Sequence, residues 1–185
     1  MKTTKISDLS GFRFPTEEEI RAVSSYMKSY FGSAMRISRT MGIVLAFLAV
    51  FMLLGFFQRK TAAGKLGAAV FCIVCAAGAF YAWRTNALTA KSLRVFEEGL
   101  FQAIDGSVAG IESVSDNPGF RNVYFMSSRG ERADGIFRVR AEKLEEGTPL
   151  LLVYVSETEY PQSGDFVRVF TPFMLTEEGI GKQLL

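Results

Sequence analysis

The chain has 185 residues, of which 49% are hydrophobic and none is histidine, so it has room for one modest domain beside a further segment. Its formal net charge of +2 conceals a basic first half, with 13 Lys and Arg against 4 Asp and Glu in residues 1–94, and an acidic second half, with 8 against 15 in residues 95–185. The missing histidine excludes Ser-His-Asp and Cys-His catalysis and most catalytic zinc sites, and the acidic second half argues against a nucleic acid as partner.

Residues 1–39 form the first predicted segment, and they are expected to contain an amphipathic helix. Thr16 follows a proline, and Glu19 comes three residues later, which is the pattern of a capping box at a helix start. Gly32 and Ser33 are expected to separate this helix from the next one. The helix can lie on the bilayer surface, on the protein's own C-terminal domain or on a partner, and the sequence leaves the three open. Its apolar face consists of Ile20, Val23, Met27, Tyr30, Phe31 and Ala34.

Residues 40–84 are predicted to form a transmembrane hairpin. Within them, residues 41–57 and 66–83 contain no charged side chain over 17 and 18 positions, which is the short end of the length that spans a bilayer. A large soluble protein can bury uncharged helices of this length, but this chain has too little other protein to surround two of them. We therefore expect two membrane helices joined by a short loop.

Basic residues beside the two uncharged stretches predict the orientation in the membrane. Three of them lie in the loop between the stretches, at Arg59, Lys60 and Lys65. Six lie on the outer flanks, at Lys28, Arg36, Arg39, Arg84, Lys91 and Arg94. Because cytoplasmic flanks carry an excess of Lys and Arg, these numbers predict a multi-pass protein of the cell membrane with both termini in the cytoplasm.

Small residues recur along both stretches and predict how the two helices pack. Close approach through small side chains is the main route to helix association in lipid, where no hydrophobic drive operates. Steps of 4, 3, 4 and 3 positions connect Ala68, Cys72, Cys75, Ala79 and Ala82 in the second stretch. The same steps connect Gly42, Ala46, Ala49, Leu53 and Phe56 in the first. We predict that these ten residues pack against one another, with Ala49 opposite Cys75 and Gly42 opposite Ala82.

Cys72 and Cys75 form a C-x-x-C motif, a spacing that also occurs in redox and zinc sites. The stretch has no Lys, Arg or His to stabilise a thiolate, and the chain has no third cysteine and no histidine to complete a thiol relay or a four-ligand metal site. We therefore interpret both cysteines as packing residues. The sequence indicates no catalytic residue, no metal ligand and no cofactor.

Residues 93–185 are predicted to form a small acidic all-β domain with a C-terminal tail, either a barrel or a sandwich. Residues 150–155 are apolar on both faces and are expected to be the central strand. In the tail, Thr176 indicates the start of a short helix. A turn is expected at Asp105 and Gly106, between the second and third strands. The strands are predicted at residues 93–96, 100–104, 108–114, 122–126, 135–141, 150–156 and 166–171. A few membrane helices followed by a small β-barrel resemble the layout of NfeD-like membrane proteins.

These features lead to two hypotheses about function. The first is a non-enzymatic integral membrane protein that presents its β domain for protein–protein interaction, as an accessory or scaffold subunit of a membrane complex. The alternative is a pore or transport subunit, in which several hairpins assemble through their small residues. Both hypotheses place the chain in a lipid bilayer with a protein partner or further copies of itself. Neither involves a nucleic acid.

Overall fold

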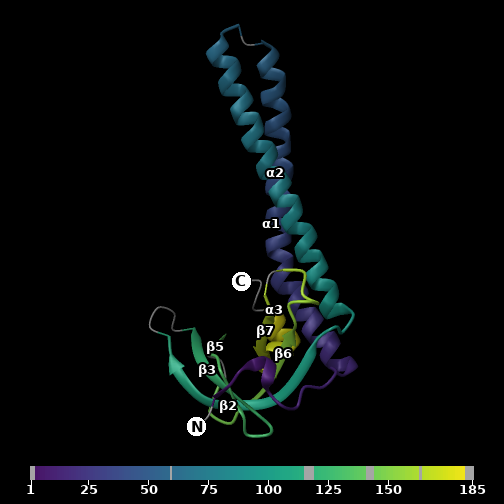
Figure 1. Cartoon of the computed structure of the whole chain (residues 1–185), viewed down its shortest axis with the longest axis vertical. Helices are drawn as coiled ribbons and strands as arrows, with labels where there is room; N and C mark the ends of the chain where they lie inside the picture. Colours follow the sequence, from purple (N-terminus) through teal and green to yellow (C-terminus); the bar gives the residue numbers. More distant parts are fainter. Residues whose placement is uncertain (1–2, 59, 115–118, 141–143, 163, 182–185) are drawn as a thin grey trace. The chain divides into compact units, whose positions relative to one another are not determined.

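The computed structural model describes residues 3–58, 60–114, 119–140, 144–162 and 164–181 (Figure 1). The chain divides into two compact units, which we name the sheet unit (residues 1–29 and 92–185) and the helix unit (residues 30–91). Helix α1 (Glu17–Gln58) and helix α2 (Ala62–Glu97) each contribute residues to both units. This division reflects compactness and does not test the predicted domains at residues 1–39, 40–84 and 93–185.

Helix α1 begins as the sequence predicts and then continues further. The Thr16 amide donates to Glu19 Oε2 at 2.7 Å, and the Glu19 amide donates to Thr16 Oγ1 at 3.3 Å, so the capping box is confirmed. The expected break at Gly32 and Ser33 is wrong, because both residues lie inside α1. One glycine within a helix costs only about 1 kcal/mol, which the helical residues on either side outweigh.

In the described residues, seven strands form one open mixed sheet in the order β1-β4-β3-β2-β6-β7, with β5 paired to β3. Only the β1–β4 pair is parallel, and the other pairs are antiparallel. The predicted barrel or sandwich is not confirmed. The strands are β1 (Thr3–Thr4), β2 (Gln102–Ser113), β3 (Phe120–Ser127), β4 (Arg132–Ala133), β5 (Phe137–Arg140), β6 (Pro149–Val155) and β7 (Phe166–Phe170).

The first three predicted strands need correction. Residues 93–96 lie in the last turns of α2, so the strand predicted there is wrong. A short run of apolar residues has the same pattern in a buried helix and in a strand. Residues 100–104 and 108–114 belong to the single strand β2, so the turn expected at Asp105 and Gly106 is absent. Gly106 serves a different purpose: a Cβ there would collide with the Met126 carbonyl oxygen and the Phe125 ring on β3.

The later strands lie close to their predicted positions. β3, β5, β6 and β7 fall within or next to the predicted runs, apart from residue 141, which lies outside the described residues. Leu152 and Val153 of β6 are fully buried, but β6 lies between β2 and the edge strand β7, so the prediction of a central position in the sheet is wrong. β1 and β4 were not predicted, because two residues carry no periodic pattern.

Residues 17–29 of α1 pack on the sheet within the sheet unit. Val23, Tyr26 and Met27 are almost fully buried. The Tyr26 ring meets Phe170 of β7 edge-on at 5.0 Å, and Arg168 Nη2 donates to the Tyr26 hydroxyl at 2.7 Å. Of the three positions that the sequence leaves open for this apolar face, its first part, with Val23 and Met27, takes the one on the protein's own sheet. Tyr30, Phe31 and Ala34 of the same predicted face belong to the helix unit.

Short helical elements complete the sheet unit. The 3-10 turns η1 (Ile6–Asp8) and η2 (Phe173–Leu175) lie near the two ends of the chain, and helix α3 (Glu177–Gly181) follows η2. The Gly179 amide donates to Thr176 Oγ1 at 3.2 Å, so the predicted helix start at Thr176 is confirmed. The Ile180 carbonyl accepts a hydrogen bond of 3.3 Å from Ser29 on α1.

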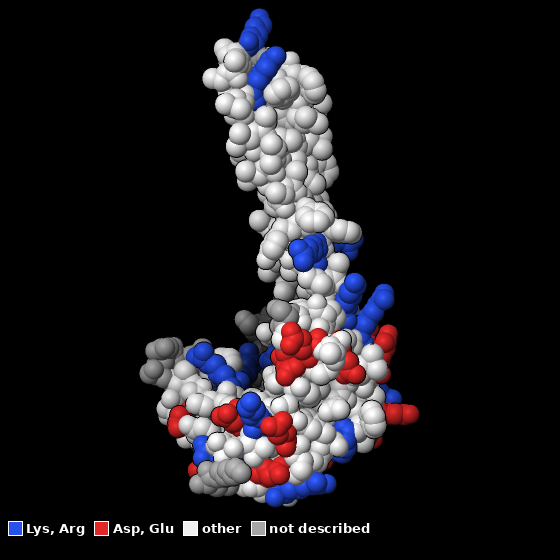
Figure 2. All heavy atoms as spheres, in the orientation of Figure 1, with Lys and Arg blue, Asp and Glu red and all other residues white. Residues whose placement is uncertain are grey.

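The helix unit consists of two antiparallel helix segments, residues 30–58 of α1 and residues 62–91 of α2. Helix α2 begins four residues before the uncharged stretch, and the Thr61 hydroxyl accepts from the Gly64 amide at 3.3 Å. On the face shown in Figure 2, the surface of this unit is uncharged over a long distance and carries basic side chains at the loop end. Both helices are long and apolar enough to cross a membrane, by length and composition.

Candidate functional site

The helix segments of the helix unit meet through small residues. A Cβ placed on Gly42 would lie 3.3 Å from the Ala82 Cβ, so the two backbones approach closely there. The Cys72 thiol donates to the Ala49 carbonyl oxygen at 3.4 Å, and the Ser38 hydroxyl donates to the Ala82 carbonyl oxygen at 3.0 Å. Each of these hydrogen bonds joins a side chain to the backbone of the opposite helix, which is possible only at short separation.

The structure places the ten predicted packing residues in different environments. On α2, Ala68, Cys75 and Ala82 are buried, and Cys72 and Ala79 are half-buried. On α1, Ala49 is buried, Gly42 and Phe56 are half-buried, and Ala46 and Leu53 are exposed. Gly42 lies next to Ala82, and the Ala49 carbonyl oxygen accepts the hydrogen bond from Cys72. The packing of Ala49 on Cys75 stays a prediction. Their role in helix association stays a prediction.

One close contact of the helix unit, between Gly78 and Leu45, was not predicted from the small-residue spacing. A Cβ on Gly78 would lie 2.9 Å from Leu45 Cδ1, and Leu45 is half-buried. Gly78 follows Cys75 by three positions and precedes Ala82 by four, so it fits the helical spacing as well as Ala79 does. The choice between two adjacent small residues depends on helix rotation, which a single sequence does not reveal.

A groove runs along one flank of the helix unit. It consists of two adjoining hollows with volumes of about 410 and 530 Å³, and both are lined by residues from α1 and α2. Arg39, Trp83 and Asn86 line both hollows. The first hollow continues over Gly42, Ala46 and Ala79, and the second over Gly32, Arg36 and Ala90. Arg36 and Arg39 therefore lie in the middle part of the groove, with small and apolar residues on both sides.

Asn86 of α2, at the middle of this groove, forms two hydrogen bonds to the backbone of α1. With its amide oriented to satisfy both of its groups, its nitrogen donates to the Met35 carbonyl at 3.2 Å and its oxygen accepts from the Arg39 amide at 3.2 Å. The side chain thus holds the backbone from which the Arg39 side chain projects. Sequence reasoning missed Asn86, although an amide directly after an uncharged stretch is a signal that could have found it.

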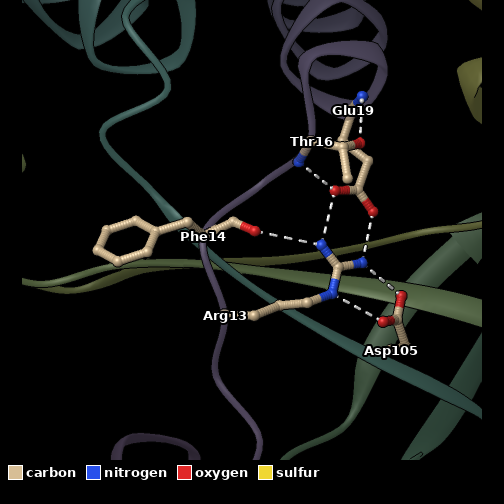
Figure 3. Close-up of polar contacts among 5 residues, drawn as sticks. All are labelled: Arg13, Phe14, Thr16, Glu19 and Asp105. Carbon is tan, nitrogen blue, oxygen red and sulfur yellow. Dashed lines mark hydrogen bonds and ion pairs between the residues drawn. The ribbon is translucent and has the colours of Figure 1, made fainter.

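A second polar cluster lies in the sheet unit (Figure 3). Arg13 Nη2 donates to Glu19 Oε1 at 2.6 Å and to Asp105 Oδ1 at 2.8 Å, while its Nε donates to Asp105 Oδ2 at 2.9 Å. Hydrogen bonds from Arg13, with backbone help from Thr16, hold the pKa of Glu19 at about 2. The same two carboxylates raise the pKa of Arg13.

The Arg13 cluster has a structural character. It connects Arg13, which precedes α1, to the start of α1 and to β2. Arg13 also forms an isolated β-bridge with Ala103 of β2 through two backbone hydrogen bonds. Glu19 stays ionised far below neutral pH, so it is unsuited to general acid or base chemistry there. Within the described residues, no group of three or more Cys, Asp or Glu side chains is placed to hold a metal ion.

Comparison of the chain with protein-family models, curated proteins and solved structures finds no match. The resemblance in layout to NfeD-like membrane proteins therefore receives no support from these comparisons. Function has to be argued from the two units of the chain and their chemistry.

Proposed function

We propose that this protein is an integral membrane protein, anchored by the hairpin of α1 and α2, that acts by binding other proteins through its sheet unit. The observation that carries this proposal is the exposure of the apolar helices. Their most apolar 18-residue windows have mean hydropathies of 2.5 and 2.0, yet only 6% and 11% of those windows is buried. The core helix of a soluble protein would be mostly buried.

The side chains on these helices support insertion into lipid. Phe47, Phe51 and Phe57 of α1 are 73%, 70% and 74% exposed, and Ile73 of α2 is 67% exposed. Keeping a large apolar side chain in water costs about 1.5 to 3 kcal/mol relative to full burial, so a row of them favours an apolar surrounding strongly. A contiguous apolar surface of this kind is typical of a membrane or partner interface.

The proposal extends to location and orientation. Six basic residues flank the hairpin on the outer side and three lie in its loop, which favours the cell membrane with both termini in the cytoplasm. The sheet unit would then face the cytoplasm. Its exposed Phe14 (87%) and Ile136 (56%) are apolar side chains available to a protein partner.

A binding role, rather than an enzymatic one, is favoured by the chemistry of the chain. It has no histidine, and the partly exposed ion cluster around Arg13 satisfies its own charges. We accordingly propose an accessory or scaffold subunit of a membrane complex, with no cofactor.

Alkaline extraction of membranes tests the anchor. The full chain is expected to stay in the membrane pellet. Replacing Phe47 and Val74 together by Arg should lower the membrane-bound fraction sharply, because each arginine at the centre of a span costs about 2.5 to 3.5 kcal/mol of insertion. Ser33→Arg, at an exposed position of α1 before the uncharged stretch, is the matched control and should leave the fraction unchanged. Release of the unaltered chain by alkali would overturn the proposal.

The alternative of an oligomeric pore is favoured by one observation: Ala46 and Leu53, which follow the small-residue spacing, remain exposed in the single hairpin. Native gel mass in mild detergent separates the two functions. A discrete homo-oligomer that conducts ions in liposomes supports the pore. A single copy that purifies with a different protein supports the scaffold.

A further inference from the structure

The groove on the flank of the helix unit has the dimensions of a lipid site. From Arg39 to Ala46 it extends over seven residues of α1, or about 10 Å at 1.5 Å per residue, and Gly32 adds about 10 Å in the other direction. The hydrocarbon core of one leaflet is about 15 Å thick. The apolar part of the groove is thus long enough for much of one acyl chain.

The Gly42 end of the groove offers a smooth surface. Gly42, Ile43, Ala46 and Ala79 line it, and three of these four are Gly or Ala. Small side chains on both helices leave this space open next to the helix contact, where Gly42 meets Ala82. An acyl chain can fill such a hollow by van der Waals contact alone.

Arg36 and Arg39, in the middle part of the groove, offer hydrogen-bond donors that no other group of the described residues uses. Within the described part of the chain, the guanidinium groups of Arg36 and Arg39 form no ion pair and no hydrogen bond, and both side chains are exposed. The neighbouring polar side chains are already occupied, Ser38 by the Ala82 carbonyl and Asn86 by the backbone of α1. The lining of both hollows contains no acidic residue.

Trp83 marks the change from apolar to basic lining. It borders both hollows and is 68% exposed. Tryptophan is enriched at the membrane–water interface, where headgroups lie. Its position therefore places Arg36 and Arg39 at headgroup depth and the Gly42 end within the hydrocarbon, if the helices cross a bilayer.

We propose that this groove binds one anionic phospholipid, with its phosphate on Arg39 and Arg36 and one acyl chain over Gly42 and Ala46. The inference rests on the proposed membrane insertion. Guanidinium matches phosphate oxygens in a two-pronged geometry, and basic pockets between membrane helices are known to hold anionic headgroups. A zwitterionic lipid fits less well, because its own ammonium group would face two arginines with no carboxylate beside them.

Native mass spectrometry of the full chain in mild detergent tests the proposal, with phosphatidylglycerol and phosphatidylcholine of the same acyl chains as probes. The chain is expected to retain one phosphatidylglycerol in preference to phosphatidylcholine. Arg39→Gln should weaken phosphatidylglycerol binding about fivefold, the equivalent of about 1 kcal/mol for one basic residue near a lipid surface. Arg39→Lys should keep most of the affinity.

Two matched controls separate a site from general attraction. Arg84→Gln removes an equal charge from an exposed position of α2 that does not line the groove. Ala46→Leu should obstruct the groove and weaken binding, whereas Ala77→Leu adds the same side chain at an exposed position outside it. The proposal predicts that both controls bind phosphatidylglycerol as the unaltered chain does.

Alkaline extraction of the same variants distinguishes the two proposals. If the unaltered chain leaves the membrane, the anchor itself is wrong. If it stays but Arg39→Gln and Arg84→Gln weaken binding equally, the lipid site is overturned and only surface attraction remains. A chain that is dimeric, and that retains phosphatidylglycerol only when Ala46→Leu breaks the dimer, would show that a second copy occupies the groove and would also overturn the lipid site.

Discussion

The sheet unit and the helix unit treat their large apolar side chains in opposite ways. In the sheet unit, Phe125, Leu152 and Phe170 are completely buried. In the described residues of the helix unit, the buried side chains are all small, at Ala49, Ala68, Cys75, Ala82 and Thr89, while most large side chains are exposed. The sheet unit therefore shields its own core from water, whereas the helix unit leaves its large apolar side chains exposed, as the proposed insertion into a membrane would require.

The largest expected effect comes from emptying the core of the sheet unit. Phe96 is 0% exposed and packs against Phe101, Tyr160 and Phe166, with ring centroids 6.1, 6.5 and 4.9 Å away. Phe96→Ala should cost about 3 to 5 kcal/mol of unfolding free energy, measured by denaturant titration of the full chain in mild detergent.

The helix unit supplies the control for this prediction. Phe51 is 70% exposed, so Phe51→Ala removes few contacts within the protein and should change the unfolding free energy little. Equal losses for the two substitutions would contradict the distinction between the units.

A smaller effect is expected where the two helices touch. Gly42→Leu places a large side chain where even a Cβ would lie 3.3 Å from Ala82, so it should separate the helices and cost about 1 to 3 kcal/mol. Gly55→Leu makes the same change in α1 at a position with no neighbouring atom within 4 Å of the added Cβ, and it should be nearly neutral. Thermal unfolding in detergent measures both. A neutral Gly42→Leu would show that the close approach is not needed for stability.

The Arg13 cluster makes a pH-dependent contribution to the sheet unit. The pKa of Glu19 falls from its ordinary 4.5 to about 2 in the folded chain, so the stabilisation is complete above pH 4.5 and is lost as the pH falls toward 2. Because the pair is partly exposed, we expect about 1 kcal/mol rather than the full value of the shift.

Glu19→Gln checks this contribution. Near pH 6 the substitution should cost about 1 kcal/mol, and between pH 4.5 and 2 it should flatten the decline in stability measured by denaturant titration. Glu18→Gln is the control, because it removes a carboxylate of the same helical turn. The Glu18 carboxylate forms no ion pair in the described structure. If both substitutions lower stability equally at pH 6, the Arg13–Glu19 pair is not the cause.

The smallest effect is expected at the cysteines. Replacing Cys72 and Cys75 together by Ala removes one thiol hydrogen bond to Ala49 and little volume, so the stability should change by about 1 kcal/mol or less. Membrane insertion and recovery of the partner should persist. Loss of function with unchanged stability would show that the thiols carry chemistry, against our interpretation of them as packing residues.

Parts of the fold were predictable because their signals are local. The Thr16 capping box, the Thr176 helix start and the buried strand β6 all depend on residues within a few positions of one another. The strand prediction at residues 93–96 was wrong because a run of four residues does not reveal its period. At Gly106 the pattern was read as a turn, whereas the glycine is required by a neighbouring strand that the local sequence does not identify.

By itself, the sequence determined the two uncharged helices, the division of charge between the halves of the chain and the absence of histidine chemistry. Only the tertiary structure decided that Arg13 meets Asp105, 92 positions away, and that Arg39 shares a groove with Trp83 and Asn86. Such pairings depend on strand order and on the rotation and register of helices. Several of these arrangements satisfy the same local pattern, and the packing of complete side chains selects one among them.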